Sequence, residues 1–108
     1  MKSVGIDVGS LTTKVVIMED SRVLSSLVVA SDDEAEAVAR KALEQALLQA
    51  GLTLDKDLYI VATGVGAKSV SFSQQQKAIT TCLARGVSLL LPTVRMAIDM
   101  GAESSTLV

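Results

Sequence analysis

Histidine and tryptophan are absent from the 108-residue chain, which has one tyrosine, one phenylalanine and one cysteine. Without histidine, the chain cannot carry a Ser-His-Asp or Cys-His mechanism. The lone Cys82 excludes a disulfide within the chain and a four-cysteine zinc or iron–sulfur site supplied by one copy. Cys82 falls on the apolar stripe of a predicted helix, so we expect it to be a packing residue.

Charge of either sign is also limited, with 10 basic residues, 12 acidic residues and a net charge of −2. No block of like charges is present that would capture nucleic acid or an anionic membrane, so neither is an expected partner. No apolar run approaches the roughly 18 residues of a membrane-spanning helix, and no secretory leader pattern opens the sequence. We therefore expect a soluble, cytoplasmic protein.

Aliphatic residues dominate what is present. Hydrophobic residues make up 49% of the chain, which excludes intrinsic disorder and predicts one small core of Val, Leu, Ile and Ala. Three β-rich stretches joined by short turns open the sequence, at residues 3–8, 12–19 and 22–30. Two short turns between three successive strands predict an antiparallel meander.

A helix is predicted to follow the meander. Ser31 and Glu34 have the spacing of a capping box, in which each side chain bonds to a backbone N–H group at the helix start. Apolar residues then recur at helical spacing as far as Ala50, and Gly51 is the expected stop.

The rest of the chain predicts a mixture of strands and a second helix. We expect a strand over 58–63 closed by a Gly-Val-Gly turn, a helix over about 75–90 that Pro92 ends, and extended segments over 94–100 and 104–108.

A repeat at an offset of 92 residues is the most informative feature of the sequence. Residues 5–16 align without gaps on residues 97–108, and the Ile, Asp, Gly and final Val of the two copies are identical. Each copy reads as a strand, an Asp at its end, a Gly turn and a hydroxyl-rich entry to a returning strand. The simpler alternative is that these are ordinary hairpin glycines, with the two Asp residues at strand ends by chance.

This pattern suits phosphate chemistry. A Gly turn brings backbone N–H groups together, and side-chain hydroxyls add further donors to phosphate oxygens. A carboxylate at a strand end can hold Mg²⁺, usually through water. Two such hairpins facing each other would clamp a triphosphate from both sides.

The first copy, residues 5–14, resembles the first phosphate motif of the actin/Hsp70/sugar-kinase superfamily. More narrowly, it resembles the ATPases that activate 2-hydroxyacyl-CoA dehydratases and the related ATPase subunits of benzoyl-CoA reductase. Three further segments support the narrower match: residues 62–66 resemble a T-G-Y-G-R turn, residues 82–86 a C-H-A-R-G helix segment, and residues 92–106 the pattern P…T-V-I-D-I-G-G-Q-D-x-K.

The resemblance implies an α/β fold of ribonuclease H-like (actin-type) architecture: half of the ATPase, with the three-stranded meander extended by parallel strands and helices packed on the sheet. Residues 1–93 would form the first actin-like subdomain, and residues 94–108 only the opening hairpin of the second. Because a severed hairpin leaves unpaired edges, we expect a homo-oligomer or a second protein chain to complete the fold.

The resemblance also implies an ATP-dependent activator that drives low-potential electron transfer to an acyl-CoA dehydratase or reductase. Its cofactors would be ATP and Mg²⁺. Family members share an iron–sulfur cluster between two subunits, and the ligands of that cluster are absent from this chain. Carried over position by position, the metal residues would be Asp7 and Asp99, and the phosphate-binding residues would be Gly9, Ser10, Thr12, Thr13, Lys14 and Gly101.

The second motif departs from the family pattern. Ala102, Glu103, Ser104 and Thr106 stand where the family has Gly, Gln, Asp and Lys. We therefore expect that the chain does not hydrolyse ATP alone. Two alternatives stay open: a degenerate noncatalytic assembly or docking module of a redox complex, and a fragment of a sugar-kinase-like or acetate-kinase-like phosphotransferase.

Overall fold

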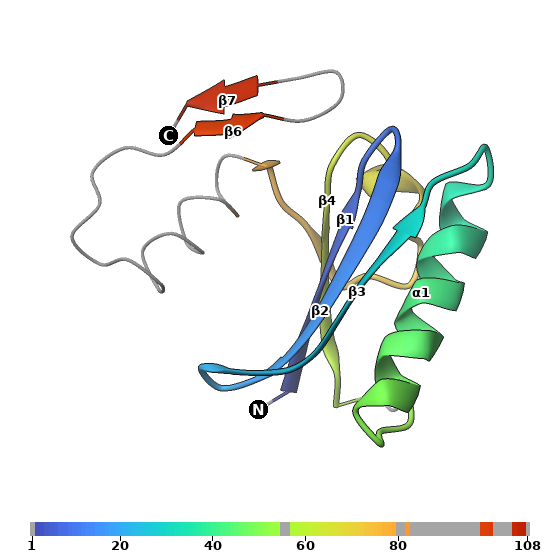
Figure 1. Ribbon diagram of the computed structural model, residues 1–108, viewed down its shortest axis with the longest axis vertical. Helices are drawn as coiled ribbons and strands as arrows, with labels where there is room; N and C mark the ends of the chain where they lie inside the picture. Colours follow the sequence, from blue (N-terminus) through green and yellow to red (C-terminus); the bar gives the residue numbers. More distant parts are fainter. Residues whose placement is uncertain (1, 55–56, 80–81, 83–97, 101–104, 108) are drawn as a thin grey trace. The chain divides into compact units, whose positions relative to one another are not determined.

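The chain forms two compact units, residues 1–76 and 77–108. The computed structural model describes residues 2–54, 57–79, 82, 98–100 and 105–107 (Figure 1). The predicted subdomain boundary at residue 93 lies outside the described residues and stays a prediction.

The first unit opens with the predicted antiparallel meander (Figure 1). Its strands are β1 (Lys2–Val8), β2 (Thr12–Glu19) and β3 (Arg22–Ala30). β1 pairs with β2 and β2 with β3, both antiparallel. The β-branched and apolar content that predicted these strands lets their side chains fill a pleated surface, and their predicted bounds are confirmed to within one residue.

Two parallel strands extend the meander. β4 (Tyr59–Thr63) pairs with β1 and the short β5 (Gln75–Gln76) pairs with β4, giving the order β3-β2-β1-β4-β5. A single turn of 3₁₀ helix, η1 (Ala67–Ser69), lies between β4 and β5 in the chain. The mixed sheet therefore confirms the predicted meander with a parallel extension.

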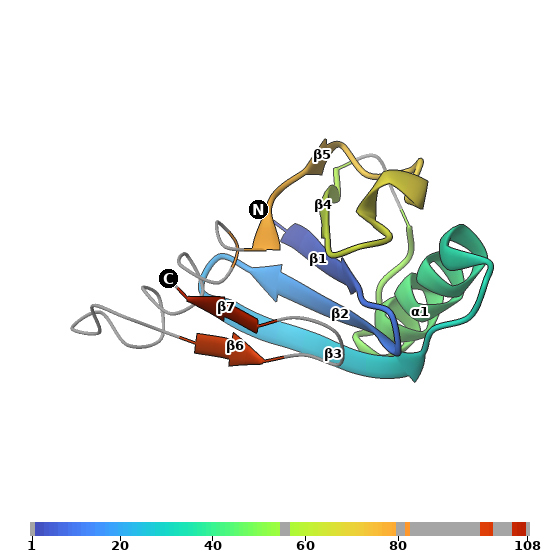
Figure 2. The same cartoon turned by 90° about the horizontal axis from the view of Figure 1, so that it is seen from above.

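Helix α1 (Ala35–Gln49) connects β3 to β4 and covers one face of the sheet (Figures 1 and 2). Its buried residues recur at intervals of three and four, as one helical face requires: Ala39, Ala42, Leu43, Ala46 and Leu47. They pack with alternate residues of three strands to form the core, which includes Val4, Ile6, Val8, Val15, Ile17, Ile60 and Ala62. Gly51, at φ +69°, ends the helical region as predicted.

The predicted capping box is wrong. Glu34 occupies the N-cap position of α1 and no side chain caps the helix there. Asp32 instead accepts the Glu34 N–H group at its Oδ1, at 2.7 Å, and the Ser31 hydroxyl donates to the Gly9 carbonyl. A capping box with Ser31 at the N-cap would start the helix at residue 32, but α1 begins three residues later, at Ala35, which leaves Ser31 outside the cap.

The predicted start of the second helix is also wrong. Gln75–Gln76 is a strand beside β4, and the preceding Gln74 fixes it there through both its backbone and its side chain. The Gln74 N–H group donates to the Ile60 carbonyl, and Gln74 Oε1 accepts the Ile60 N–H group. Farther on, the Cys82 N–H group donates to the Ala78 carbonyl, a helical bond; the rest of that predicted helix lies outside the described residues.

The second unit contains one described hairpin, β6 (Ile98–Met100) paired antiparallel with β7 (Ser105–Leu107). These strands confirm the predicted extended segments where the structure describes them. Within the described part of the chain, no helix is long and apolar enough to cross a membrane.

Candidate functional site

The β1–β2 hairpin carries the first predicted phosphate motif. Asp7 stands opposite Lys14 in the strand register, and the Gly9 N–H group donates to the Thr12 carbonyl at 2.9 Å to close the turn. Side chains alternate between the faces of a strand, and the neighbouring Ile6 and Val8 lie in the core under α1. Asp7 and Lys14 therefore lie on the face of the sheet opposite α1.

Asp7 and Lys14 form an ion pair on that face. Lys14 Nζ lies 3.5 Å from Asp7 Oδ2, and the two side chains are 47% and 39% exposed. The ammonium group also lies close to the turn, because a Cβ atom built on Gly9 would be 3.8 Å from it. The pair therefore holds one positive and one negative group at the mouth of the turn, both reachable from solvent.

The turn after β4 adds to this site. Since β1 and β4 run parallel, their carboxyl ends lie together, with Asp7 level with Thr63. Gly64 follows at φ +92°, and a Cβ atom there would lie 2.6 Å from Asp7 Oδ1. The Gly66 N–H group donates to the Val8 carbonyl at 3.0 Å. The Gly-Val-Gly turn thus packs against the end of β1, and glycine at position 64 leaves the space beside the predicted metal carboxylate that a Cβ atom would fill.

Gly64 is not among the predicted site residues, although the sequence predicts its turn. The signal that could have found it is the parallel pairing of β1 and β4, which brings the two strand ends to the same edge. Ser10 is exposed and Thr12 half-buried beside Gly9, so the structure brings five predicted residues together around one turn: Asp7, Gly9, Ser10, Thr12 and Lys14.

Thr13 has a different environment from its neighbours. Its side chain is fully buried on the α1 side of the sheet, and its Oγ1 lies 2.8 Å from Ser31 Oγ. The predicted contact of Thr13 with phosphate stays a prediction, while its described hydrogen bond links the turn to the segment before α1.

The second hairpin repeats the register of the first. Ile98, Asp99 and Met100 pair with Leu107, Thr106 and Ser105, just as Ile6, Asp7 and Val8 pair with Val15, Lys14 and Thr13. The repeat seen in the sequence is therefore a repeat of strand pairing. In the second hairpin, Asp99 is equivalent to Asp7 of the first, and Thr106 is equivalent to Lys14. Gly101 lies outside the described residues.

Asp7 is a residue whose carboxylate could hold Mg²⁺, and its predicted role as a metal residue stays a prediction. A nucleotide-bound Mg²⁺ takes most of its ligands from phosphate and water, so one carboxylate at this position fits it. Within the described residues, no cluster of three or more His, Cys, Asp or Glu side chains could hold a metal by itself. An iron–sulfur cluster does not fit, because it takes four ligands, usually cysteine thiolates, and each copy of the chain has one cysteine.

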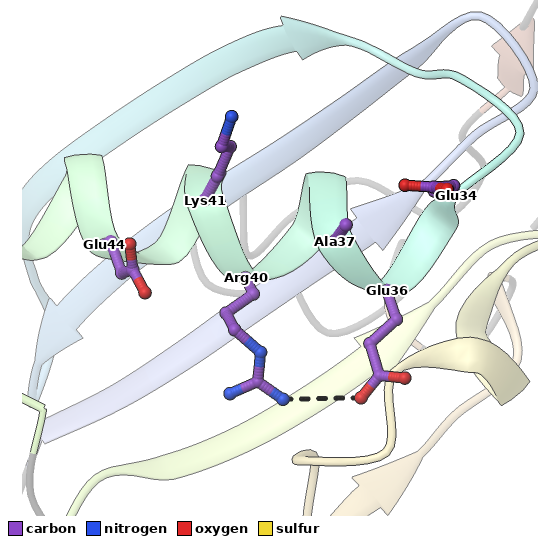
Figure 3. Close-up of a pocket in the computed structure, with 6 residues that line it drawn as sticks. All are labelled: Glu34, Glu36, Ala37, Arg40, Lys41 and Glu44. Carbon is purple, nitrogen blue, oxygen red and sulfur yellow. Dashed lines mark hydrogen bonds and ion pairs between the residues drawn. The ribbon is translucent and has the colours of Figure 1, made fainter.

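A shallow hollow lies elsewhere, on the outer side of α1 (Figure 3). It is lined by Glu34, Glu36, Ala37, Arg40, Lys41 and Glu44. Arg40 pairs with Glu36 at 3.3 Å and also lies over the Phe72 ring, 4.6 Å from its centroid. The contact with Phe72 links α1 to the segment before β5, and the sheet separates the hollow from Asp7.

Comparison with known proteins identifies close relatives. A model of the BadF/BadG/BcrA/BcrD ATPase family matches residues 4–108. The activator of lactoyl-CoA dehydratase from Anaerotignum propionicum is 33% identical over 105 residues, which are 97% of this chain and 40% of that protein.

Two solved structures of such activator proteins also resemble this chain. Component A of (R)-2-hydroxyglutaryl-CoA dehydratase from Acidaminococcus fermentans has a TM-score of 0.90 and 26% identity, covering 100% of this chain and 42% of its own. The activator of 2-hydroxyisocaproyl-CoA dehydratase from Clostridium difficile, solved with bound ADPNP, has a TM-score of 0.88 and 28% identity, covering 99% of this chain and 40% of its own. The predicted actin-type α/β fold is confirmed, and the chain spans about 40% of the length of these relatives.

Proposed function

Because the chain belongs to the BadF/BadG/BcrA/BcrD ATPase family, we propose that it is the N-terminal, phosphate-binding portion of an ATP-dependent activator of an acyl-CoA dehydratase or reductase. The activator would couple ATP hydrolysis to low-potential electron transfer into that partner enzyme. The observation that carries the proposal is the Asp7–Lys14 pair at the mouth of the Gly9 turn, with Gly64 against the Asp7 carboxylate.

The chemistry of this arrangement supports nucleotide binding. Lys14 offers a positive charge to the β- and γ-phosphates, and Gly9, Ser10 and Thr12 offer a closely approachable backbone and hydroxyl donors. Asp7 would hold Mg²⁺ through its water shell. The bound Mg²⁺ would neutralise phosphate charge, and Lys14 would exchange its carboxylate partner for a phosphate oxygen.

Hydrolysis requires more than this hairpin. In the proposal Asp99 and Gly101 of the second motif also bind the nucleotide, as the repeat in the sequence predicts. A homo-oligomer partner or a second protein chain would complete the fold. The cluster ligands would come from a second chain, because one cysteine per copy cannot supply them. Since the chain spans 40% of the length of its relatives, we expect ATP binding without turnover from the chain alone.

Calorimetric titration of the chain with ATP and Mg²⁺ tests the proposal, using Asp7→Asn as the site variant. Glu19→Gln is a matched control, because Glu19 and Lys2 form a cross-strand ion pair of similar exposure at the other end of the same two strands. We expect saturable binding by the wild type and the control, and its loss in Asp7→Asn. No heat from a folded wild-type protein, or equal binding by all three proteins, would contradict a nucleotide site at this hairpin.

A further inference from the structure

Ser31 contacts the proposed phosphate-binding turn at three points, although it lies 18 residues after Thr13 in the sequence. Its backbone N–H group donates to the Leu11 carbonyl at 2.8 Å, its hydroxyl donates to the Gly9 carbonyl at 2.8 Å, and its Oγ lies 2.8 Å from Thr13 Oγ1. These bonds join the segment between β3 and α1 to both sides of the turn.

The direction of the chain of hydroxyl groups follows from proton count. A serine hydroxyl has a single proton to donate, and Ser31 gives its proton to the Gly9 carbonyl. The bond between Thr13 and Ser31 must then be donated by Thr13. The resulting relay runs from Thr13 through Ser31 to Gly9, and each bond in such a chain polarises the next.

The relay also accounts for the burial of Thr13. A fully buried hydroxyl without a partner is costly, and Thr13 is 0% exposed. Ser31 supplies its acceptor. The Gly9 N–H group donates to Thr12 and the Gly9 carbonyl accepts from Ser31, so both backbone polar groups of Gly9 are hydrogen-bonded. These bonds fix the peptide groups at the start of the turn.

We propose that Ser31 is a positioning residue that fixes the Gly9–Thr12 turn in the geometry that receives phosphate. This inference rests on the proposed function, since it assigns Ser31 to the same nucleotide site. Ser31 acts through Gly9 and Thr13 and does not itself contact the nucleotide. Binding to a turn that is already ordered avoids the entropic cost of ordering it.

The variants Ser31→Ala and Ser31→Thr test this role, because the first removes the hydroxyl and the second retains it. Ser25→Ala is the matched control. Ser25 is also on the α1 side of β3, and its hydroxyl donates to Gln49 Oε1 at 3.1 Å, at the opposite end of α1 from the turn. Losing the Ser25 hydroxyl removes one hydrogen bond far from the turn, whereas losing the Ser31 hydroxyl removes the two that support the turn, to Gly9 and to Thr13.

Two measurements separate positioning from stability. In the ligand-free protein, we expect the Gly9 amide to exchange roughly tenfold faster in Ser31→Ala than in the wild type, and at the wild-type rate in Ser31→Thr and Ser25→Ala. In calorimetry with ATP and Mg²⁺, we expect affinity to fall roughly five- to tenfold in Ser31→Ala alone. The thermal unfolding temperature should fall further in Ser31→Ala than in Ser25→Ala, since Ser31→Ala breaks two hydrogen bonds and leaves the buried Thr13 hydroxyl without its acceptor.

The outcomes distinguish this inference from the proposed function. If the wild type binds ATP and Ser31→Ala binds equally well, Ser31 is not a positioning residue while the nucleotide site stands. If Ser25→Ala loses as much affinity as Ser31→Ala, the effect is one of general stability and the inference again fails. If the wild type binds no ATP, the proposed function fails, and the Gly9 amide rate still decides whether Ser31 holds the turn.

Discussion

Asp7 and Lys14 face each other across the β1–β2 ladder, with Lys14 Nζ 3.5 Å from Asp7 Oδ2. In the ligand-free protein each group neutralises the other. A nucleotide with bound Mg²⁺ presents a complementary pair, a phosphate for Lys14 and a hydrated cation for Asp7. Under the proposed function, the ion pair would keep the two groups in place until the nucleotide and its Mg²⁺ bind.

We expect Lys14→Met to weaken binding of ATP with Mg²⁺ by at least roughly tenfold, since a charge-assisted bond to phosphate is lost. Its effect on unfolding free energy should stay within about 1 kcal/mol, because partly exposed ion pairs contribute little. Lys2→Met is the control, as Lys2 pairs with Glu19 on the same strands. Calorimetry and urea unfolding measure the two effects, and equal affinity losses in both variants would contradict the role of Lys14.

Gly64 is expected to tolerate no side chain. Gly64→Ala places a methyl group 2.6 Å from Asp7 Oδ1 at a backbone φ of +92°, so strain and overlap should together cost about 3 kcal/mol or more. Gly51→Ala has the positive φ without the overlap and should cost about 1 kcal/mol. Gly5→Ala has neither and should be close to neutral. Urea unfolding of the three variants orders them, and a mild effect at Gly64 would contradict the close approach.

The buried face of α1 should determine the stability of the first unit. Leu43→Ala removes a side chain that is 2% exposed, and we expect a loss of about 2–5 kcal/mol from the lost burial and the cavity. Leu48→Ala changes a side chain that is 81% exposed on the same helix and should stay within about 0.5 kcal/mol. Equal losses in chemical unfolding would mean that α1 packs on the sheet by a different face.

Periodicity predicted the three meander strands and α1 because side-chain burial on a pleated sheet or a helix repeats with a fixed period. Periodicity could not predict β5, because this strand has only two residues, Gln75 and Gln76, and both are polar. That strand is held in the sheet because Gln74 forms hydrogen bonds with Ile60 on β4. A contact between residues so far apart in the chain cannot be predicted from the local sequence.

The candidate site was predictable in part for the same reason. Asp7, Gly9 and Lys14 lie within one hairpin, so their spacing in the sequence nearly fixes their spacing in space. Gly64 and Ser31 reach the same turn from distant segments. The local pattern of Ser31 suggested a helix cap, but the nearby Gly9 carbonyl and the buried Thr13 hydroxyl offered bonds that only the folded sheet creates.

The identical register of the two hairpins leads to a gain-of-function prediction. Thr106 stands opposite Asp99 as Lys14 stands opposite Asp7, and it also occupies the position at which the related motif has lysine. If the second hairpin contributes to the nucleotide site, Thr106→Lys adds a positive charge at its phosphate-binding position. We expect affinity for ATP with Mg²⁺ to rise by roughly three- to tenfold at low salt and the gain to shrink as salt screens it.

Thr53→Lys is the control for Thr106→Lys, because it makes the same change of net charge at an exposed position just after α1. A gain in affinity confined to Thr106→Lys means that the second hairpin takes part in the nucleotide site. The absence of the family's lysine at position 106 then accounts for part of the lower affinity. Equal gains in affinity in both variants would mean that the effect comes from net charge alone and not from the position of the lysine. No gain in Thr106→Lys, from a wild type that binds ATP, would mean that the first hairpin binds phosphate without help from the second.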